Sequence, residues 1–470
     1  MKEAKVIDYD AFRDQIGTVD EEGKRRWVFP KKPKGQHHRL RVIVTVILLS
    51  IFFAGPFIKI GGYPLLLLNI LERKFIILGV PFWPQDFHLL ALGLITLFLF
   101  IILFTVIFGR IWCGWACPQT LFMEMVFRKI EYAIEGDAPA QRKLARAPWN
   151  GEKIFKKGLK WTIFFLISFL IAHTVMSYLI SWEELIKIVQ EGPDKHWGKF
   201  TFVIVFSGLF FFVFTYLREQ ACIVICPYGR LQGALLDKNS IVVHYDHVRG
   251  EPRGPLKKGQ DRTSGDCIAC KLCVQVCPTG IDIKDGTQME CVNCTACMDV
   301  CDSVMEKVGF EKGLIRYASY NQVESGQKFS FTPRIIAYIG VLFALVLVMG
   351  FSLSNRNPVE GTILRTKGTL YQIKDEHTIT NLFNIQIINK THNSYDLELR
   401  LLEPEGGSIE MVGQGLHLND QDMATGSFFI QMPRQELTKM KQKVQIGIYA
   451  EDVMLEKVKS TFVGPPVVGK

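Results

Sequence analysis

Residues 267–301 contain the run Cys267-x2-Cys270-x2-Cys273-x3-Cys277-Pro278 and then Cys291-x2-Cys294-x2-Cys297-x3-Cys301, eight of the twelve cysteines in the chain. The two-residue gaps wrap a tight loop around three thiolates. Pro278 ends the local helical turn and directs the fourth thiolate away. Asp302 follows Cys301, so the second half lacks the proline but keeps every sulfur. Each half therefore predicts an iron–sulfur centre.

This spacing is that of a bacterial two-cluster ferredoxin, in which the fourth cysteine of each half binds the other cluster. It predicts an inserted α+β domain with two [4Fe-4S] clusters. The first cluster is then held by Cys267, Cys270, Cys273 and Cys301, and the second by Cys291, Cys294, Cys297 and Cys277. The alternatives are zinc and disulfides, but zinc knuckles rarely place four cysteines in one such run, let alone twice.

Around this domain the chain is apolar, with 34 phenylalanines among 470 residues and a positive mean hydropathy of +0.16. Five runs are long enough to cross a bilayer: residues 42–58, 89–109, 161–181, 201–217 and 335–354. Residues 64–80 are apolar too, but Glu72, Arg73 and Lys74 interrupt them. Since charges at mid-bilayer are costly, we expect an extracytoplasmic loop there.

Basic residues predict the orientation of these spans. Lysine and arginine number 11 in residues 1–41, 10 in residues 110–160 and 15 in residues 218–334. The loops 59–87 and 182–200 hold 3 each. The positive-inside rule then places the N-terminus and the cluster domain in the cytoplasm of a bacterial inner membrane. The net charge of +9 indicates topology and contact with anionic lipid rather than nucleic acid.

The expected organisation has five parts: a cytoplasmic segment (1–41), four membrane helices (42–217, with cysteine motifs reaching 227), a linker and ferredoxin domain (228–334), a fifth helix (335–354) and a periplasmic domain (355–470). The last part contains no cysteine. Its short alternating stretches, such as Leu382–Ile388, and turn residues such as Gly406-Gly407 predict an all-β immunoglobulin-like sandwich. We expect it to dock a partner or to act as a solubilising cap.

The other four cysteines form two matching motifs, Cys113-x3-Cys117-Pro118 after the second span and Cys222-x3-Cys226-Pro227 after the fourth. Residues i and i+4 share a helix face, so each pair should present two sulfurs in one direction. Arg110 and Arg218 precede the pairs; they either favour the thiolates or anchor the spans on the cytoplasmic side. If the motifs meet, four soft thiolates could bind Cu(I), zinc or an iron–sulfur centre; the alternative is four small buried hydrophobes.

Histidines are weaker candidates. His173 and Met176 lie three residues apart near the outer end of the third span and could pass copper inward, although a histidine bonded within the bundle is commoner. His37-His38 is expected at the membrane interface. A basic linker (Arg249, Arg253, Lys257, Lys258 and Arg262) suits the membrane surface or an acidic donor protein.

Several further stretches carry a resemblance to a known family. They are Phe82-Trp83-Pro84-Gln85-Asp86-Phe87, Trp112-Cys113-Gly114-Trp115-Ala116-Cys117-Pro118-Gln119-Thr120, Gly250-Glu251-Pro252-Arg253-Gly254-Pro255 and Cys277-Pro278-Thr279-Gly280-Ile281-Asp282-Ile283. With these stretches the chain resembles the cytochrome c oxidase accessory protein family CcoG, also called FixG or RdxA, over nearly its whole length.

The resemblance implies a cupric reductase that reduces Cu(II) to Cu(I) for assembly of cbb(3)-type cytochrome c oxidase. It implies copper at Cys113, Cys117, Cys222 and Cys226, and clusters at the other eight cysteines. The expected partners are copper, copper chaperones or oxidase assembly factors, and a cytoplasmic flavodoxin, ferredoxin or flavoprotein as donor; a homodimer stays open. Two other functions remain: a quinol dehydrogenase of the NapH type, and a non-enzymatic copper-binding scaffold.

Overall fold

The computed structural model describes residues 18, 22, 24–70, 74–83, 86–256, 264–355, 357, 359–366, 368, 370–391, 393–413, 415–419, 422–437 and 439–465. The interrupting charges Glu72 and Arg73, and Lys257, Lys258 and Arg262 of the basic linker, lie outside these residues. The chain divides into two compact units, Met1–Val348 and Met349–Lys470.

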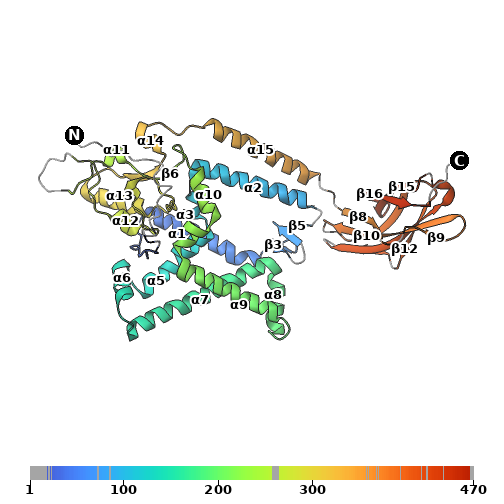
Figure 1. Ribbon diagram of the computed structural model, residues 1–470, viewed down its shortest axis with the longest axis horizontal. Helices are drawn as coiled ribbons and strands as arrows, with labels where there is room; N and C mark the ends of the chain where they lie inside the picture. The colour runs from blue at the N-terminus through green and yellow to red at the C-terminus, as the bar shows by residue number, and fades with distance from the viewer. Residues whose placement is uncertain are drawn as a thin grey trace. The chain divides into compact units, whose positions relative to one another are not determined.

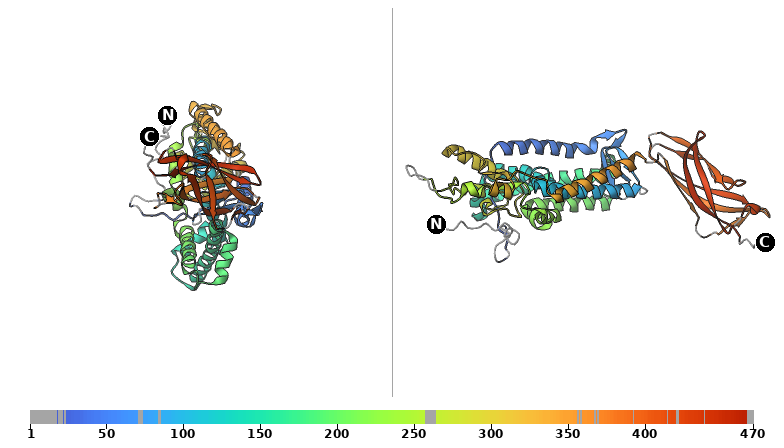
Figure 2. Two further views of the ribbon diagram at one scale, coloured as in Figure 1. Left: turned by 90° about the vertical axis from the view of Figure 1, so that its right-hand side faces the viewer. Right: turned by 90° about the horizontal axis from the view of Figure 1, so that it is seen from above.

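The described residues contain five helices long and apolar enough to cross a membrane, as the hydropathy predicted: Gln36–Phe57, Phe87–Phe108, Gly151–Ile180, Trp197–Leu217 and Pro333–Ser354. In chain order, these five spans correspond to the helices α1 (Gln36–Ala54), α2 (Phe87–Phe108), α7 (Gly151–Ile180), α9 (Trp197–Phe212) and α15 (Pro333–Ser354). The third begins ten residues before its apolar run, because the Asn150 side chain caps it by accepting from the Lys153 N–H at 2.9 Å. Among them, α7 packs across α9, and α2 lies beside α15 (Figures 1 and 2).

Phenylalanines fill the centre of the helix bundle. Phe127, Phe164 and Phe214 are each at most 1% exposed, and the rings of Phe127 and Phe214 stack with centroids 4.3 Å apart. Residues 64–80 are more ordered than the simple loop expected. They contribute to an antiparallel three-stranded sheet of β3 (Leu66–Asn69), β4 (Lys74–Ile77) and β5 (Val80–Phe82).

The cluster domain lies at the opposite end of the bundle from that sheet (Figure 1). Its strands β6 (Val242–Tyr245) and β7 (Ile315–Ala318) pair antiparallel. The other elements are the helices α11 (His247–Gly250), α12 (Leu272–Val276), η7 (Ile283–Asp285), α13 (Ala296–Val308) and α14 (Tyr320–Ser325). Both cysteine runs thus lie in loops and short helices around one small sheet, as expected for an α+β ferredoxin-like domain.

Short elements link the bundle to this domain. After α2 come α3 (Ile111–Trp115), α4 (Pro118–Leu121), the π-helix η4 (Phe122–Phe127), α5 (Arg128–Ile134) and α6 (Ala138–Arg146). The helix α8 (Trp182–Glu191) joins α7 to α9, which continues through the π-helical turns η5 (Val213–Leu217) and η6 (Ala221–Ile225) into α10 (Pro227–Leu235). A short turn η2 (Gly55–Phe57) and the two-residue strands β1 (Lys59–Ile60) and β2 (Tyr63–Pro64) follow α1.

The second unit is a β-sandwich, as predicted. One sheet has the order β12 (Ser408–Val412), β14 (Met423–Pro433), β10 (Thr378–Asn389) and β8 (Val359–Arg365), with β9 (Gln372–Ile373) beside β10. The other has the order β13 (Leu416–Leu418), β11 (Tyr395–Glu403), β15 (Lys441–Ala450) and β16 (Val453–Val463). The turn η8 (Arg434–Glu436) follows β14. Alternate residues such as Phe383 and Ile446 from both sheets form one core.

Candidate metal centre

Two cavities in the cluster domain are each bordered by four cysteines. One is lined by Cys267, Cys270, Cys273 and Cys301, and the other by Cys277, Cys291, Cys294 and Cys297, with Cys273 also at its edge. These are the two ligand sets that the crossed ferredoxin spacing predicts. The residues therefore fit two [4Fe-4S] clusters, with the fourth cysteine of each run in the cavity of the other.

The second cavity also has buried positive charge beside it. The Arg41 side chain is 4% exposed and donates to the carbonyl oxygens of Gly114 at 2.9 Å and Cys294 at 3.3 Å. Its second terminal nitrogen is buried without a hydrogen-bond partner among the described residues. Burial raises the pKa of Cys291 to about 12, whereas the Arg110 charge lowers it. A cluster with four thiolates is anionic, so these two cations would offset its charge.

The paired motifs share a local shape that differs from the expected single helix face. Cys113 lies in α3, but Cys117 has extended backbone (φ −64°, ψ 123°) before Pro118. Cys226 is likewise extended (φ −68°, ψ 112°) before Pro227. Proline disfavours helical backbone in the preceding residue, so the helix stops between the two cysteines of each pair. The expectation that both sulfurs share one helix face was therefore wrong.

The duplication itself holds in the backbone. Gly109, four residues before Cys113, has φ 56° and ψ −127°, and Arg218, four residues before Cys222, has φ 55° and ψ −123°. Arg110 therefore corresponds to Glu219, and the two arginines that precede the pairs are not equivalent. Arginine rarely adopts this left-handed backbone, so its side chain must hold it there.

The two motifs meet in the fold. The Cys113 thiol donates to the Gln232 side-chain oxygen on α10 at 3.0 Å, and Arg110 donates to the same oxygen at 3.1 Å. Burial raises the pKa of Cys222 to about 12, and the thiols of Cys117 and Cys113 add to the shift. Burial also raises the pKa of Cys113, and the neighbouring Arg110 only partly opposes it. Of the two roles considered for the arginines, lowering of the thiol pKa does not prevail at Cys113, because desolvation outweighs the charge of Arg110.

Both motifs also contact the loop of the second cluster. Cys113 packs in one apolar group with Val292 and the ligands Cys294 and Cys297. Cys222 borders a cavity that is also lined by Pro278 and Thr279, the residues that follow the ligand Cys277. The carbonyl oxygen of Asn293 would lie 2.7 Å from a Cβ added to Gly114, and that of Val292 closer still. Glycine thus allows the first motif to approach the cluster loop closely.

A buried network of charges holds the motifs together. Arg218 donates to both oxygens of Glu131, at 2.9 and 2.6 Å. Lys160 on α7 lies 3.4 Å from the same carboxylate. The adjacent Glu219 pairs with Arg25 at 2.8 Å and with Arg128 at 3.7 Å. Glu131 and Arg128 follow the first motif (Cys113 and Cys117), and Arg218 precedes the second (Cys222 and Cys226). The network therefore sets the position of one cysteine motif relative to the other.

The histidine candidates lie elsewhere. The ring of His173 is hydrogen-bonded to the Phe169 carbonyl oxygen of its own helix at 2.9 Å, and Met176 is buried within the bundle. Among the described residues, neither side chain contacts the cysteines of the paired motifs (Cys113, Cys117, Cys222 and Cys226). His37 does not simply face the interface, because its ring contacts Asp299 at 2.9 Å.

In the described part of the chain, no group of three or more His, Cys, Asp or Glu side chains is close enough to hold a single metal ion. Each thiolate of a cubane would bind a different iron, so cluster ligands need not be close enough to share one ion. The sulfurs of Cys113, Cys117, Cys222 and Cys226 would have to move closer to one another to bind one ion.

Sequence reasoning missed three residues that join the cluster domain to the membrane helices: Arg41, Gly114 and Asp299. Asp299 lies between the ligands Cys297 and Cys301 and accepts from the backbone N–H groups of His37 and His38, at 3.0 and 2.8 Å. It thereby caps the N-terminus of α1 from another element. The sequence does show an acidic residue between two ligand cysteines. Its partners His37 and His38 lie more than 260 residues away, so no local pattern connects them.

Comparisons with known families match three parts of the chain. Residues 217–320 match the 4Fe-4S dicluster domain, residues 90–135 match a 4Fe-4S binding domain, and residues 349–465 match the IG-like fold at the C-terminal of FixG, whose description names it an oxidoreductase. A FixG-related protein from Vibrio parahaemolyticus is similar over 23% of this chain and 99% of that structure, at 14% identity and a TM-score of 0.21.

Several relatives match at the level of sequence, three of them as follows. The protein RdxB of Cereibacter sphaeroides is 33% identical over 83% of this chain and 85% of its own length. The nitrogen fixation protein FixG of Rhizobium meliloti is 29% identical over 83% of this chain and 82% of its own. The protein RdxA of Cereibacter sphaeroides is 35% identical over 62% of each. With its five apolar helices and two cluster sites, the chain belongs to the FixG/RdxA family of iron–sulfur membrane proteins, also called CcoG.

Proposed function

We propose that this chain is a cupric reductase, which takes electrons at the cluster domain and reduces Cu(II) at Cys113, Cys117, Cys222 and Cys226. The observation that supports it is the contact of both cysteine motifs with the loop of the second cluster. When bound, the clusters supply electrons one at a time. One electron converts Cu(II) to Cu(I), and thiolates prefer Cu(I), so the four cysteines would stabilise the product.

The residues around the cysteines would prepare this reduction. Because the thiol pKa values of Cys113 and Cys222 are raised by burial, copper must displace protons to bind. Gln232, which accepts from Cys113, and the Arg218–Glu131 pair would hold the two motifs while the sulfurs close around the ion. Both pairs belong to one chain, so this proposal places all four ligands in a single protomer.

The wider proposal keeps the basic residues and the cluster domain on the cytoplasmic side and the sandwich in the periplasm. Copper would be exchanged with copper chaperones or with assembly factors of a cbb(3)-type oxidase. The sandwich is then the surface available to a periplasmic partner.

The test is anaerobic purification with iron, sulfide and copper counts, followed by stopped-flow mixing of the reduced protein with Cu(II). The Cys113→Ser/Cys222→Ser variant should retain cluster iron and lose copper binding and copper reduction. The reciprocal variant Cys270→Ser should lose iron and retain copper binding. Unchanged copper stoichiometry in the double variant would refute the site. Reduction of the clusters by menaquinol without any response to Cu(II) would instead favour the quinol dehydrogenase.

A further inference from the structure

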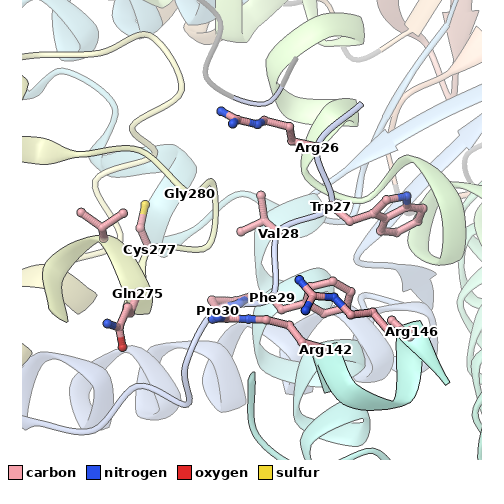
Figure 3. Close-up of a pocket in the computed structure, with 12 residues that line it drawn as sticks. Arg26, Trp27, Val28, Phe29, Pro30, Arg142, Arg146, Gln275, Cys277 and Gly280 are labelled. Atoms are coloured by element: carbon pink, nitrogen blue, oxygen red, sulfur yellow. The ribbon is translucent and has the colours of Figure 1, made fainter. Parts of the chain in front are cut away.

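A cavity of about 470 Å³ opens beside the second cluster site. The backbone segment from Arg26 to Pro30 forms one wall, the helix α6 supplies Arg142 and Arg146, and the loop around Cys277 closes the far side. Figure 3 shows the Cys277 sulfur and these arginines around the same space. Its volume is in the range of sites for small molecules and cofactors.

The lining is strongly cationic. Arg26, Arg142 and Arg146 all border the cavity, and all three are exposed. None of them forms an ion pair with a carboxylate in the residues that the structure describes. Three guanidinium groups without anionic partners around one space favour a phosphate-bearing ligand, because arginine binds phosphate through paired charge-assisted hydrogen bonds.

The walls are held in place without a ligand. The backbone N–H of Lys31 donates to the Gln275 carbonyl at 2.7 Å, which ties the N-terminal segment to the cluster domain. Tyr132 donates to the Pro30 carbonyl at 3.2 Å, and the Lys32 N–H donates to Asp137 at 2.9 Å, immediately before α6. The cavity is therefore a preformed site between three elements of one unit.

Two further features indicate a planar redox ligand. Phe29 lines the cavity and offers aromatic surface for stacking. Trp27 lines it too, with the Arg25 guanidinium over one face of its ring, 4.1 Å from the centroid. Cys277, a predicted ligand of the second cluster, is part of the wall. We propose that this cavity binds a phosphate-bearing flavin nucleotide, which delivers electrons to the cluster domain.

The electron count favours a flavin over a nicotinamide nucleotide. A reduced nicotinamide gives up a hydride, which carries two electrons at once, whereas a cluster accepts one. A flavin hydroquinone can release its two electrons singly. It becomes oxidised flavin and releases two protons to solvent, while the two clusters held by the eight cysteines take up one electron each. This inference rests on the proposed function in one respect, which is that the clusters pass their electrons on to copper.

Binding can be measured without turnover, from the quenching of flavin fluorescence when FMN is added to the anaerobic, cluster-loaded full-length protein in detergent. We expect saturable quenching, and binding of riboflavin, which lacks the phosphate, at least about tenfold weaker. Arg142→Gln/Arg146→Gln should weaken FMN binding by at least about tenfold and leave riboflavin unchanged. Trp27→Leu should reduce the quenching by both flavins.

The matched control is Lys143→Gln, which removes a positive charge from the same helix, on an exposed residue that does not line the cavity. It should leave FMN affinity unchanged. Equal affinity for FMN and riboflavin, equal losses in the control and the arginine variant, or no saturable quenching would each overturn the proposal. Displacement of FMN by phosphatidylglycerol at equal or lower concentration would also overturn it, by assigning the cavity to a lipid headgroup.

A second readout connects the cavity to the clusters. Reduced FMN should bleach the cluster absorbance with a rate that saturates with FMN concentration, and the arginine variant should lose that saturation. Dithionite should reduce the clusters of both proteins equally. If dithionite-reduced protein fails to reduce Cu(II) while FMN binding and cluster reduction persist, the proposed function fails alone. If it reduces Cu(II) but does not bind FMN, the flavin site fails alone.

Discussion

The substitution Gly114→Ala tests whether the first cysteine motif must lie directly against the loop of the second cluster. An added Cβ would stand 2.7 Å from the Asn293 carbonyl oxygen, whereas ordinary contact begins at 3.4 Å. The two backbones would therefore have to separate by more than about 0.7 Å, since the Val292 carbonyl oxygen would be closer still. The Gly114 carbonyl is held by Arg41, and the loop around Asn293 would be held by the cluster that its cysteines bind. The strain therefore cannot relax locally.

Overpacking of this kind costs about 1–3 kcal/mol. If the strain is released when the interface opens, the open form becomes about 5- to 150-fold more populated. The loss of iron from the second cluster to a chelator proceeds through that open form. We therefore expect iron release from this cluster to accelerate by the same factor, and copper reduction by the prereduced protein to slow.

The control is Gly158→Ala in α7, where an added Cβ meets no atom within 4 Å. This variant should keep the iron-release rate of the parent and be slightly more stable, because alanine favours helix. Iron release is followed anaerobically with a coloured chelator, and the two clusters are separated by their EPR signals. Equal iron release from the Gly114→Ala and Gly158→Ala proteins would refute the close-contact argument.

Three further predictions concern the buried charges. Burial raises the pKa of Glu131, but Arg218 and Lys160 outweigh it and lower the pKa to about 2. The stability that ionised Glu131 gives the fold is therefore complete above pH 4.5, its unfolded pKa, and is lost as the pH falls through 2. Glu131→Gln should lower the free energy of unfolding by about 3–5 kcal/mol at neutral pH and by less at low pH, whereas the exposed control Glu152→Gln should not change thermal unfolding measurably. Arg110→Gln should lower the potential of the second cluster, because the Arg110 charge acts on the ligand Cys291 and its removal disfavours the more negative, reduced cluster; an EPR redox titration that moves neither cluster would contradict this. Asp299→Ala should destabilise the protein by about 1–2 kcal/mol through loss of the α1 cap, and an unchanged melting temperature would argue against that cap.

The cysteines were predictable from their spacing because a cluster site is built from local sequence. Three ligands of each cubane lie within seven residues, so the loop that holds them is short. The fourth ligand follows from the crossed ferredoxin pattern. The five spans and the alternating strands around Phe383 and Ile446 were likewise predictable, because burial in lipid or in a sandwich imposes a period on neighbouring residues.

The geometry of each cysteine pair was not predictable from helical spacing. Cys117 and Cys226 both precede a proline, and the extended backbone that proline favours at this position overrides the i, i+4 periodicity. The proline was visible in the sequence, so this error came from giving periodicity more weight than the steric rule.

The sequence alone predicts the two cluster sites and the five apolar spans. Both depend on residues that lie close together along the backbone. Only the tertiary structure decides that the two cysteine motifs adjoin the second cluster, and that Arg41 links residues 73 and 253 positions away. Contacts at such separations leave no period or motif in the sequence, because they depend on how whole helices pack around buried charges.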